Sequence, residues 1–336
     1  MKPGIGLPVT TRARRLFAAK LLTALLVSLC LISAAGADER KLKHLHVGGG
    51  LSHPPYTMIL QVMYPNIVYD SAAPDTQYTS LDVYTLDAPE PRSPVMVFVH
   101  GGAFQASDKG WSKDLHPKPE YFNSKLGYIF VSVNYRLLPE GRYPTNVQDV
   151  ANALAWVHDH IAEFGGDPQQ IFLMGHSAGA VLVTQVSTDE TFLKKAGKDL
   201  RIVKGVISNE NTRAYNIADG FDPKSAEILF GPDWRNASPA VHLAKDKGIP
   251  PFLLLYVANG TGISADSQKQ AQGFAQLLRA ADVRVETLGL DHVEHFGANE
   301  RLGEPGDVIT AKVEEFLTSI ATSKRAVGWA AGRPLN

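Results

Sequence analysis

The sequence predicts an α/β domain with a mostly parallel central sheet and helices on both faces. Short apolar runs alternate with helix-length segments along most of the 336 residues, which is typical of a parallel sheet covered by helices. Two runs, residues 95–99 and 171–174, are apolar throughout, as expected for strands buried on both faces. Each leads directly into a glycine-rich segment, so we expect functional groups at the carboxyl ends of these strands.

Composition sets the broad class. The chain is 44% hydrophobic and carries 33 basic against 34 acidic residues, which is typical of an ordinary globular protein of one large domain. No repeat or low-complexity segment is present, and the balanced charge gives no reason to expect nucleic acid as a partner.

The amino terminus predicts export. A basic stretch precedes an apolar run over residues 21–35, and residues 35–37 form a small-x-small cleavage signal. The basic residues are Arg12, Arg14, Arg15 and Lys20. The run is too short and too rich in small residues for a membrane anchor, so residues 1–37 are predicted to be a cleavable signal peptide. We therefore expect a periplasmic or secreted protein without stable membrane insertion. The single cysteine, Cys30, would be lost with the peptide, leaving no thiol nucleophile or cysteine metal ligand.

The remaining elements are expected in a simple order. Residues 38–66 are predicted to be a loosely ordered lead-in, residues 67–323 the α/β domain and residues 324–336 a disordered tail. The predicted strands are residues 67–69 and 78–84 at the edge, then 95–99, 128–133, 171–174, 202–207, 252–257 and 283–288. The predicted helices are residues 146–164, 178–186, 268–281 and 310–322. Residues 209–250, rich in Asn, Asp, Gly and Pro, are predicted to form a small excursion over the strand ends.

The central motif is Gly175-His176-Ser177-Ala178-Gly179. A strand, a serine flanked by glycines and then a helix is the context of a nucleophile elbow, in which a sharp turn exposes the hydroxyl. The pattern by itself is also compatible with an ordinary glycine-rich turn before a helix. The other parts of a hydrolytic site therefore decide between the two interpretations.

An oxyanion hole is predicted after the strand at residues 95–99. Adjacent Gly101 and Gly102 allow backbone N–H groups to face a ligand without side-chain obstruction. Together with the N–H of Ala178, they would stabilise a tetrahedral oxyanion. His100 is expected to be a structural hydrogen-bonding residue of this loop.

The general base is predicted among the histidines that follow the last strand. In hydrolases of the chain order serine, acid, histidine, the base lies in this region, where the sequence has His292 and His295. His295 is preferred, with His292 as the alternative. An imidazole suits the task because its ordinary pKa lies near neutrality.

The acid is the part of the site that the motifs indicate least directly. It is expected in the loop after residues 252–257, where Asp266 is the only carboxylate. The same aspartate could instead cap the helix that follows. Asp291 is too near His295 along the chain to be a comfortable alternative, and Glu210, after the preceding strand, is a more remote one.

Several short segments, among them His100-Gly101-Gly102-Ala103-Phe104 and residues 175–179, resemble those of the α/β-hydrolase esterases of the hormone-sensitive-lipase and feruloyl-esterase-like branch. The resemblance covers about residues 80–317 and implies an α/β-hydrolase fold with nucleophile Ser177, base His295 and oxyanion donors Gly101, Gly102 and Ala178. The acid loop departs from the family pattern, because Thr261 or Ile263 occupies the region where these enzymes usually have an aspartate. The segments that carry the resemblance are His100-Gly101-Gly102-Ala103-Phe104, Asn134-Tyr135-Arg136-Leu137, Pro139-Glu140, Tyr143-Pro144, Asp149, Trp156, residues 164–168, residues 175–179 and Ser238-Pro239.

The function that follows is a serine hydrolase that cleaves short-chain carboxylic esters of small molecules through an acyl-enzyme. No metal or organic cofactor is expected. Two further functions remain open. Kynurenine-formamidase-like relatives share the His-Gly-Gly loop, so an arylformamidase is one, and an inactive hydrolase fold that binds a small molecule or a protein is the other. The sequence does not indicate the oligomeric state.

Overall fold

The computed structural model describes residues 42–45, 60–111 and 115–330. The predicted signal peptide at residues 1–37 lies outside the described residues. In the part of the chain that is described, no helix is both long and apolar enough to cross a membrane.

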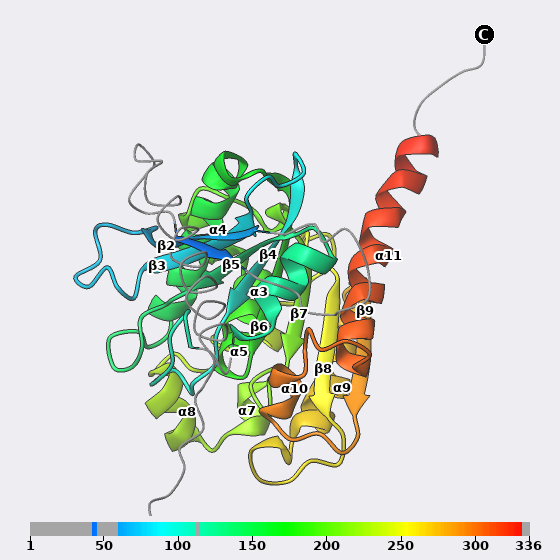
Figure 1. Ribbon diagram of the computed structural model, residues 1–336. Coiled ribbons are helices and arrows are strands. Elements are labelled where there is room, and N and C mark those ends of the chain that lie inside the picture. The colour runs from blue at the N-terminus through cyan, green and yellow to red at the C-terminus, as the bar shows by residue number, and fades with distance from the viewer. Residues whose placement is uncertain (1–41, 46–59, 112–114, 331–336) are drawn as a thin grey trace, which may run out of the picture. The chain divides into compact units, whose positions relative to one another are not determined.

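Within these described ranges, a nine-stranded sheet forms the centre of the fold, in the order β1-β2-β3-β5-β4-β6-β7-β8-β9 (Figure 1). The strands are β1 (Leu42–Leu45), β2 (Leu60–Val68), β3 (Ser80–Leu86), β4 (Ser93–Val99), β5 (Ile129–Val133), β6 (Gly166–His176), β7 (Val203–Asn209), β8 (Phe252–Val257) and β9 (Val285–Leu290). Pairing is antiparallel from β1 through β3 to β5 and parallel from β5 to β9. The predicted α/β-hydrolase fold with a mostly parallel sheet is confirmed.

Helices cover both faces of the sheet because the central strands are apolar on both sides. On β4, Val95, Val97 and Val99 pack into a core with α4, α5, α6 and α9, whereas Met96 and Phe98 pack into a second core with η1 and α11. Alternate residues of a strand point to opposite faces, which divides the run in this way. The helices are α3 (Lys118–Glu120), η1 (Tyr121–Lys125), α4 (Thr145–His160), η2 (Ile161–Phe164), α5 (Ala178–Thr188), α6 (Glu190–Lys195), η3 (Leu200–Ile202), α9 (Ser267–Ala280), α10 (Gly297–Glu300) and α11 (Val308–Ala330).

The excursion between β7 and β8 carries short helices. These are α7 (Ile217–Gly220), α8 (Pro223–Phe230) and η4 (Pro239–His242), followed by η5 (Gly262–Ser264) after β8. At the start of α8 the Asp222 carboxylate accepts hydrogen bonds from the N–H groups of Lys224 and Ser225, which satisfies donors that lack partners within the helix. In Figure 1, α7, α8 and α10 lie at the end of the sheet toward which β8 and β9 point. The excursion therefore borders the carboxyl ends of the parallel strands.

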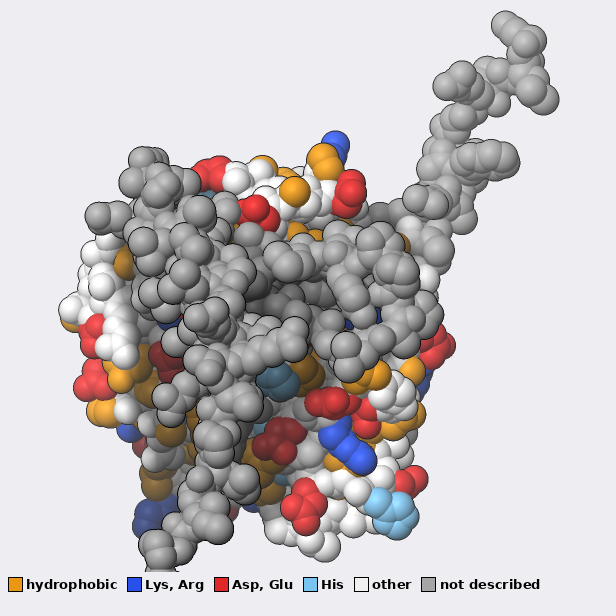
Figure 2. All heavy atoms as spheres, in the orientation of Figure 1, with side chains coloured by type: hydrophobic (Ala, Val, Ile, Leu, Met, Phe, Trp, Pro, Cys, Tyr) orange, Lys and Arg blue, Asp and Glu red, His pale blue; other side chains and the backbone are white. Residues whose placement is uncertain are grey.

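Two predicted segments differ from the structure. Within the lead-in predicted for residues 38–66, β1 and most of β2 pair with the sheet, because backbone ladders stabilise strands whose side-chain alternation is weak. The closing helix α11 continues to Ala330, so the predicted tail is helical over residues 324–330. On the face in Figure 2, acidic and basic side chains lie scattered among hydrophobic and other side chains.

Candidate active site

Ser177 lies at a strained turn between β6 and α5. Its backbone has φ 54° and ψ −120°, a conformation that costs on the order of 1–3 kcal/mol for a residue with a side chain. The flanking glycines permit the turn, since a Cβ on Gly179 would lie 2.0 Å from the Val99 carbonyl oxygen and one on Gly175 would lie 2.4 Å from the Gly179 carbonyl oxygen. The Ser177 N–H donates to the Asn209 carbonyl oxygen of β7 at 3.0 Å. The turn is therefore held on both sides by neighbouring backbone.

A histidine and a carboxylate extend from Ser177 as a chain of hydrogen bonds. His295 Nε2 lies 2.9 Å from Ser177 Oγ, and His295 Nδ1 lies 2.8 Å from Glu210 Oε2. Because a carboxylate accepts, Nδ1 carries the proton and Nε2 accepts the serine O–H. Glu210 is fully buried and His295 is 5% exposed. This arrangement is that of a general base oriented by an acid.

Glu210 is held by the ends of two strands. It follows β7 directly with φ 55°, and its N–H donates to the Leu255 carbonyl oxygen of β8 at 2.8 Å. Its carboxylate accepts the N–H of Val257 at 2.8 Å and the hydroxyl of Ser264 at 2.6 Å. Burial acts to raise the pKa of Glu210, but hydrogen bonds from His295, Ser264 and the Val257 N–H outweigh it and hold the pKa below the ordinary 4.5. The acid is therefore ionised at neutral pH.

The prediction that Asp266 contacts the histidine is wrong. Its side chain is 44% exposed and pairs with Arg213 at 4.0 Å, at the start of α9. The acid comes instead from the end of the neighbouring strand β7, and Ser264 of the expected loop donates to it. The available signal was a glutamate placed immediately after a buried strand. Asp291 and His292 are both exposed, and the chain of hydrogen bonds from Ser177 includes neither of them.

The loop after β4 lies against the serine turn. A Cβ on Gly101 would lie 3.2 Å from Ser177 Cβ, and Gly102 has φ +104° with Ala106 backbone so close that a Cβ would lie 2.0 Å from its oxygen. Ala178 is the first residue of α5. The structure thus brings Gly101, Gly102 and Ala178 to the same place as Ser177. His100 is buried, with Nδ1 2.8 Å from the Gly101 carbonyl oxygen and its ring stacked on Tyr135.

His176, the residue before the serine, ties the histidine loop to the elbow. Its Nε2 lies 3.0 Å from the His295 carbonyl oxygen, so the protonated nitrogen donates to that oxygen, and the two rings lie 4.8 Å apart. Burial, and to a smaller extent the charge of the neighbouring His295, hold the pKa of His176 well below its ordinary value of 6.5. His176 is therefore neutral in the folded protein. Sequence reasoning did not single out this residue.

The neutral state of His176 predicts a pH-dependent stability. Below about pH 6.5 the unfolded chain binds a proton at this position that the folded chain does not. The free energy of unfolding therefore decreases as the pH is lowered, by up to about 1.4 kcal/mol per pH unit. His176→Gln keeps an N–H donor but does not titrate. We expect a shallower decline between pH 7 and pH 5 for this variant, measured by urea unfolding. The exposed His292→Gln serves as the control, and equal slopes for wild type and His176→Gln would contradict the prediction.

Two hollows adjoin the site. A cavity of about 280 Å³ lies beside Ser177 and is lined mainly by apolar side chains. A second, of about 650 Å³, is lined by residues 257–261, 263–264 and 291–296, which include His295. The residues of the first cavity are Ala103, Phe104, Ser177, Ala178, Val181, Thr212, Arg213, Ala214, Phe221, Leu229, Phe230 and Ile263. The apolar cavity is the natural place for the part of a substrate next to the serine.

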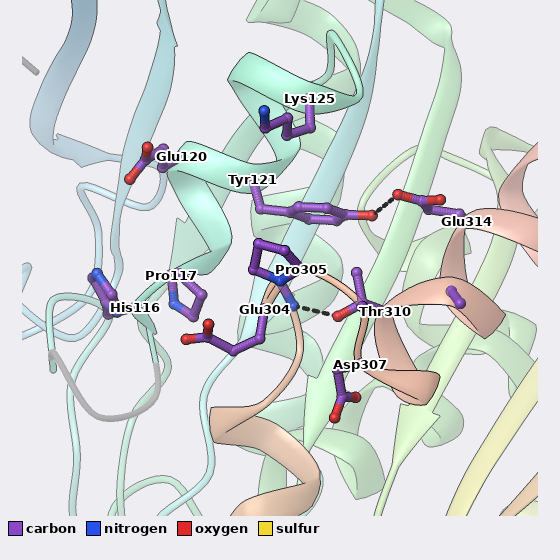
Figure 3. A pocket seen from close by; sticks show the side chains of 13 residues that line it. His116, Pro117, Glu120, Tyr121, Lys125, Glu304, Pro305, Asp307, Thr310 and Glu314 are labelled. Carbon is purple, nitrogen blue, oxygen red and sulfur yellow. Dashed lines mark hydrogen bonds between the residues drawn. The ribbon is translucent and has the colours of Figure 1, made fainter. Parts of the chain in front are cut away.

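A third hollow, of about 560 Å³, lies apart from the serine between η1 and the start of α11. Figure 3 shows Tyr121 directed toward Glu314, and the two are hydrogen-bonded. Thr310 accepts the N–H of Gly303 at 2.8 Å, and Asp307 pairs with Arg301 at 3.6 Å. These polar groups of the wall therefore have partners within the protein. Among the described residues, no group of three or more His, Cys, Asp or Glu side chains could hold a metal ion.

Comparisons with known proteins find similarity to esterases. Residues 79–197 match the model of the carboxylesterase family. The probable carboxylic ester hydrolase LipM of Mycobacterium tuberculosis is 28% identical over 96% of this chain and 77% of its own length. The isoprenylcysteine alpha-carbonyl methylesterase ICME of Arabidopsis thaliana is 25% identical over 73% of this chain, which spans 62% of that relative. A solved structure of esterase Est2 from Thermogutta terrifontis superposes with a TM-score of 0.60 at 23% identity, over 75% of this chain and 91% of that one.

The class follows from fold and site together. A parallel sheet whose carboxyl edge presents a serine, a histidine and a buried carboxylate in hydrogen-bond contact defines an α/β-hydrolase with a serine nucleophile. With the family match and the esterase relatives, the protein is a carboxylesterase-type enzyme.

Proposed function

We propose that the protein hydrolyses short-chain carboxylic esters of small molecules through an acyl-enzyme. Ser177 is the nucleophile, His295 the general acid and base, and Glu210 the acid that orients His295. The observation that carries the proposal is the continuous hydrogen-bond chain from Glu210 through His295 to Ser177, at the edge of an apolar cavity.

The geometry supports two successive acyl transfers. Ser177 Oγ attacks the ester carbonyl carbon while its proton passes to His295 Nε2, 2.9 Å away. Collapse of the tetrahedral intermediate breaks the bond to the alcohol, which leaves with that proton. A water molecule then gives its proton to Nε2 and attacks the acyl-enzyme, which releases the carboxylic acid and restores the serine hydroxyl. Glu210 remains ionised throughout and stabilises the imidazolium.

The N–H groups of Gly101, Gly102 and Ala178 are proposed as the oxyanion donors. They belong to a loop and a helix start that adjoin Ser177, and the α5 N-terminus adds a favourable dipole for a negative oxygen. Removing one such donor in other serine hydrolases costs roughly 10²–10³ in kcat.

The size of the apolar cavity supports short acyl groups. Phe230 lies 5.8 Å from Phe104 and 5.7 Å from Phe221, ring centre to ring centre, in edge-to-face contacts. These rings close the cavity to about 280 Å³. A long acyl chain would have to displace packed aromatic rings or extend into solvent.

A series of nitrophenyl esters from acetyl to decanoyl tests the proposal. We expect kcat/KM to be highest for short acyl groups and to fall by at least about tenfold at decanoyl, since a chain outside the cavity gains little burial. N-formylkynurenine is measured alongside, and Ser177→Ala supplies the blank. A preference for the formamide would identify an arylformamidase instead, and silence on every substrate would favour the inactive binding fold.

The finer resemblance to the hormone-sensitive-lipase and feruloyl-esterase-like branch, and export to the periplasm or medium, form part of the same proposal. They are supported by the motifs of residues 100–179 and by the basic and apolar pattern of residues 1–37. Sequencing of the processed amino terminus checks the export, with Asp38 expected as the first residue. Detection of intact residues 1–37 on the exported protein would contradict the cleavage.

A further inference from the structure

The cavity beside Ser177 contains a charged side chain in apolar surroundings. Among the described residues that line it, Arg213 carries the single charge, and none carries a carboxylate. Arg213 follows β7 three positions after Glu210, so it belongs to the same chain segment that delivers the acid. A cation beside an apolar cavity is costly to desolvate unless an anion accompanies it.

The position of Arg213 is set by its neighbours. Its guanidinium carbon lies 5.6 Å from the centre of the Phe221 ring, within the range of a cation–π contact. Its carbonyl oxygen lies so close to Gly220 that a Cβ there would be 1.9 Å away. The backbone and one face of the guanidinium are therefore held, while the side chain remains 33% exposed.

The ion pair between Arg213 and Asp266 is weak compared with the pair between Arg136 and Asp149 in the same fold. Arg213 Nη2 lies 4.0 Å from Asp266 Oδ2, beyond hydrogen-bond distance, and that carboxylate is 44% exposed. Arg136, in contrast, donates from Nε at 2.9 Å to the fully buried Asp149. A guanidinium has five N–H donors in a planar fork, so Arg213 retains donor capacity toward the cavity.

We propose that Arg213 binds a carboxylate carried by the substrate, so that the preferred substrates are esters with a free carboxylate a few atoms from the scissile bond. This inference rests on the proposed esterase function. A single guanidinium matches a singly charged, planar carboxylate, to which it can donate two parallel hydrogen bonds. The carboxylate belongs to either the acyl or the alcohol part of the substrate.

Two matched substrate pairs test the inference. For the acyl side, mono-4-nitrophenyl glutarate is compared with 4-nitrophenyl pentanoate. For the alcohol side, 4-acetoxybenzoate is compared with its methyl ester. Rates with Ser177→Ala are subtracted from each. In the wild type we expect kcat/KM to favour the anionic member of at least one pair by about tenfold, the effect of a hydrogen-bonded charge pair in a partly exposed site.

Variants then assign the preference to the guanidinium. Arg213→Met keeps the length of the side chain but removes the charge, and it should reverse the anionic-to-neutral ratio, mainly through a higher KM for the anion. Arg213→Lys should retain part of the ratio, and Asp266→Asn should raise it by removing a competing carboxylate. The exposed Arg279→Met on α9 is the matched control and should leave both rates unchanged.

The outcomes separate this inference from the esterase proposal. Wild type that prefers the neutral member of both pairs, or an anionic-to-neutral ratio that Arg213→Met leaves unchanged, would overturn the role of Arg213. In either case the neutral esters would still be hydrolysed in a Ser177-dependent manner, and the proposed function would stand. If the wild type did not hydrolyse the neutral esters, the proposed function itself would be contradicted.

Discussion

Replacing Glu210 with glutamine is expected to lower kcat by about 10³–10⁴-fold, as loss of the acid does in other serine triads. The carboxylate accepts the Nδ1 proton of His295 at 2.8 Å, which leaves Nε2 free to accept from Ser177. A glutamine amide that donates to Nδ1 would stabilise the other tautomer and place a proton on Nε2. The effect should appear in kcat, with KM changed little, in steady-state assays on a nitrophenyl acetate substrate.

Asp266→Asn is the control variant for Glu210→Gln. Asp266 is half-exposed and faces Arg213 rather than His295, so its loss should change kcat on a neutral ester by less than about threefold, as for an exposed charge pair. Circular dichroism of both variants checks that each of them folds. An Asp266→Asn enzyme as impaired as Glu210→Gln would contradict the assignment of the acid.

Replacing Ser177 with alanine is expected to lower kcat by about 10⁴–10⁶-fold, because among the described residues Ser177 is the hydroxyl that contacts His295 Nε2. The residual rate would come from substrate binding and the oxyanion donors alone. A fluorophosphonate probe provides a direct readout, since it labels a serine activated by a neighbouring base. We expect labelling of the wild type and none of the variant.

Ser71→Ala, at an exposed turn, is the matched serine control. It should retain full turnover and full labelling. Undiminished hydrolysis by Ser177→Ala, or labelling at a different serine, would place the nucleophile elsewhere and overturn the proposed mechanism.

Most of the fold could be predicted because its signals are local. The run at residues 252–257 coincides with β8, and the apolar runs before Gly101 and Gly175 lie within the central strands β4 and β6. A strand buried on both faces has an apolar side chain at nearly every position, which is visible without any knowledge of its neighbours. The strands β1 and β2 escaped prediction in large part because backbone pairing with an adjacent strand stabilises them, and that pairing leaves little trace in residue type.

The same distinction applies to the site. Ser177, Gly101, Gly102 and Ala178 belong to short motifs. In these motifs Gly102, Gly175 and Gly179 are required because a Cβ would lie 2.0–2.4 Å from a backbone oxygen. Chain order narrowed the base to His292 and His295 with a preference for His295, and the hydrogen bonds to Ser177 and Glu210 identify His295. The serine and the glycines were determined by the sequence itself, because the steric demands of the elbow leave few other positions for them.

The identity of the acid was decided by the tertiary structure alone. Glu210 and Asp266 both lie at the carboxyl edge of the sheet, one after β7 and one after the loop that follows β8. Parallel pairing sets the end of β7 beside that of β8, and the positive φ of Glu210, the Val257 N–H and the Ser264 hydroxyl hold its carboxylate against His295. Asp266 instead remains with Arg213 at the surface. Which carboxylate reaches the imidazole depends on contacts between segments about 50 residues apart in the chain, and no local pattern encodes them.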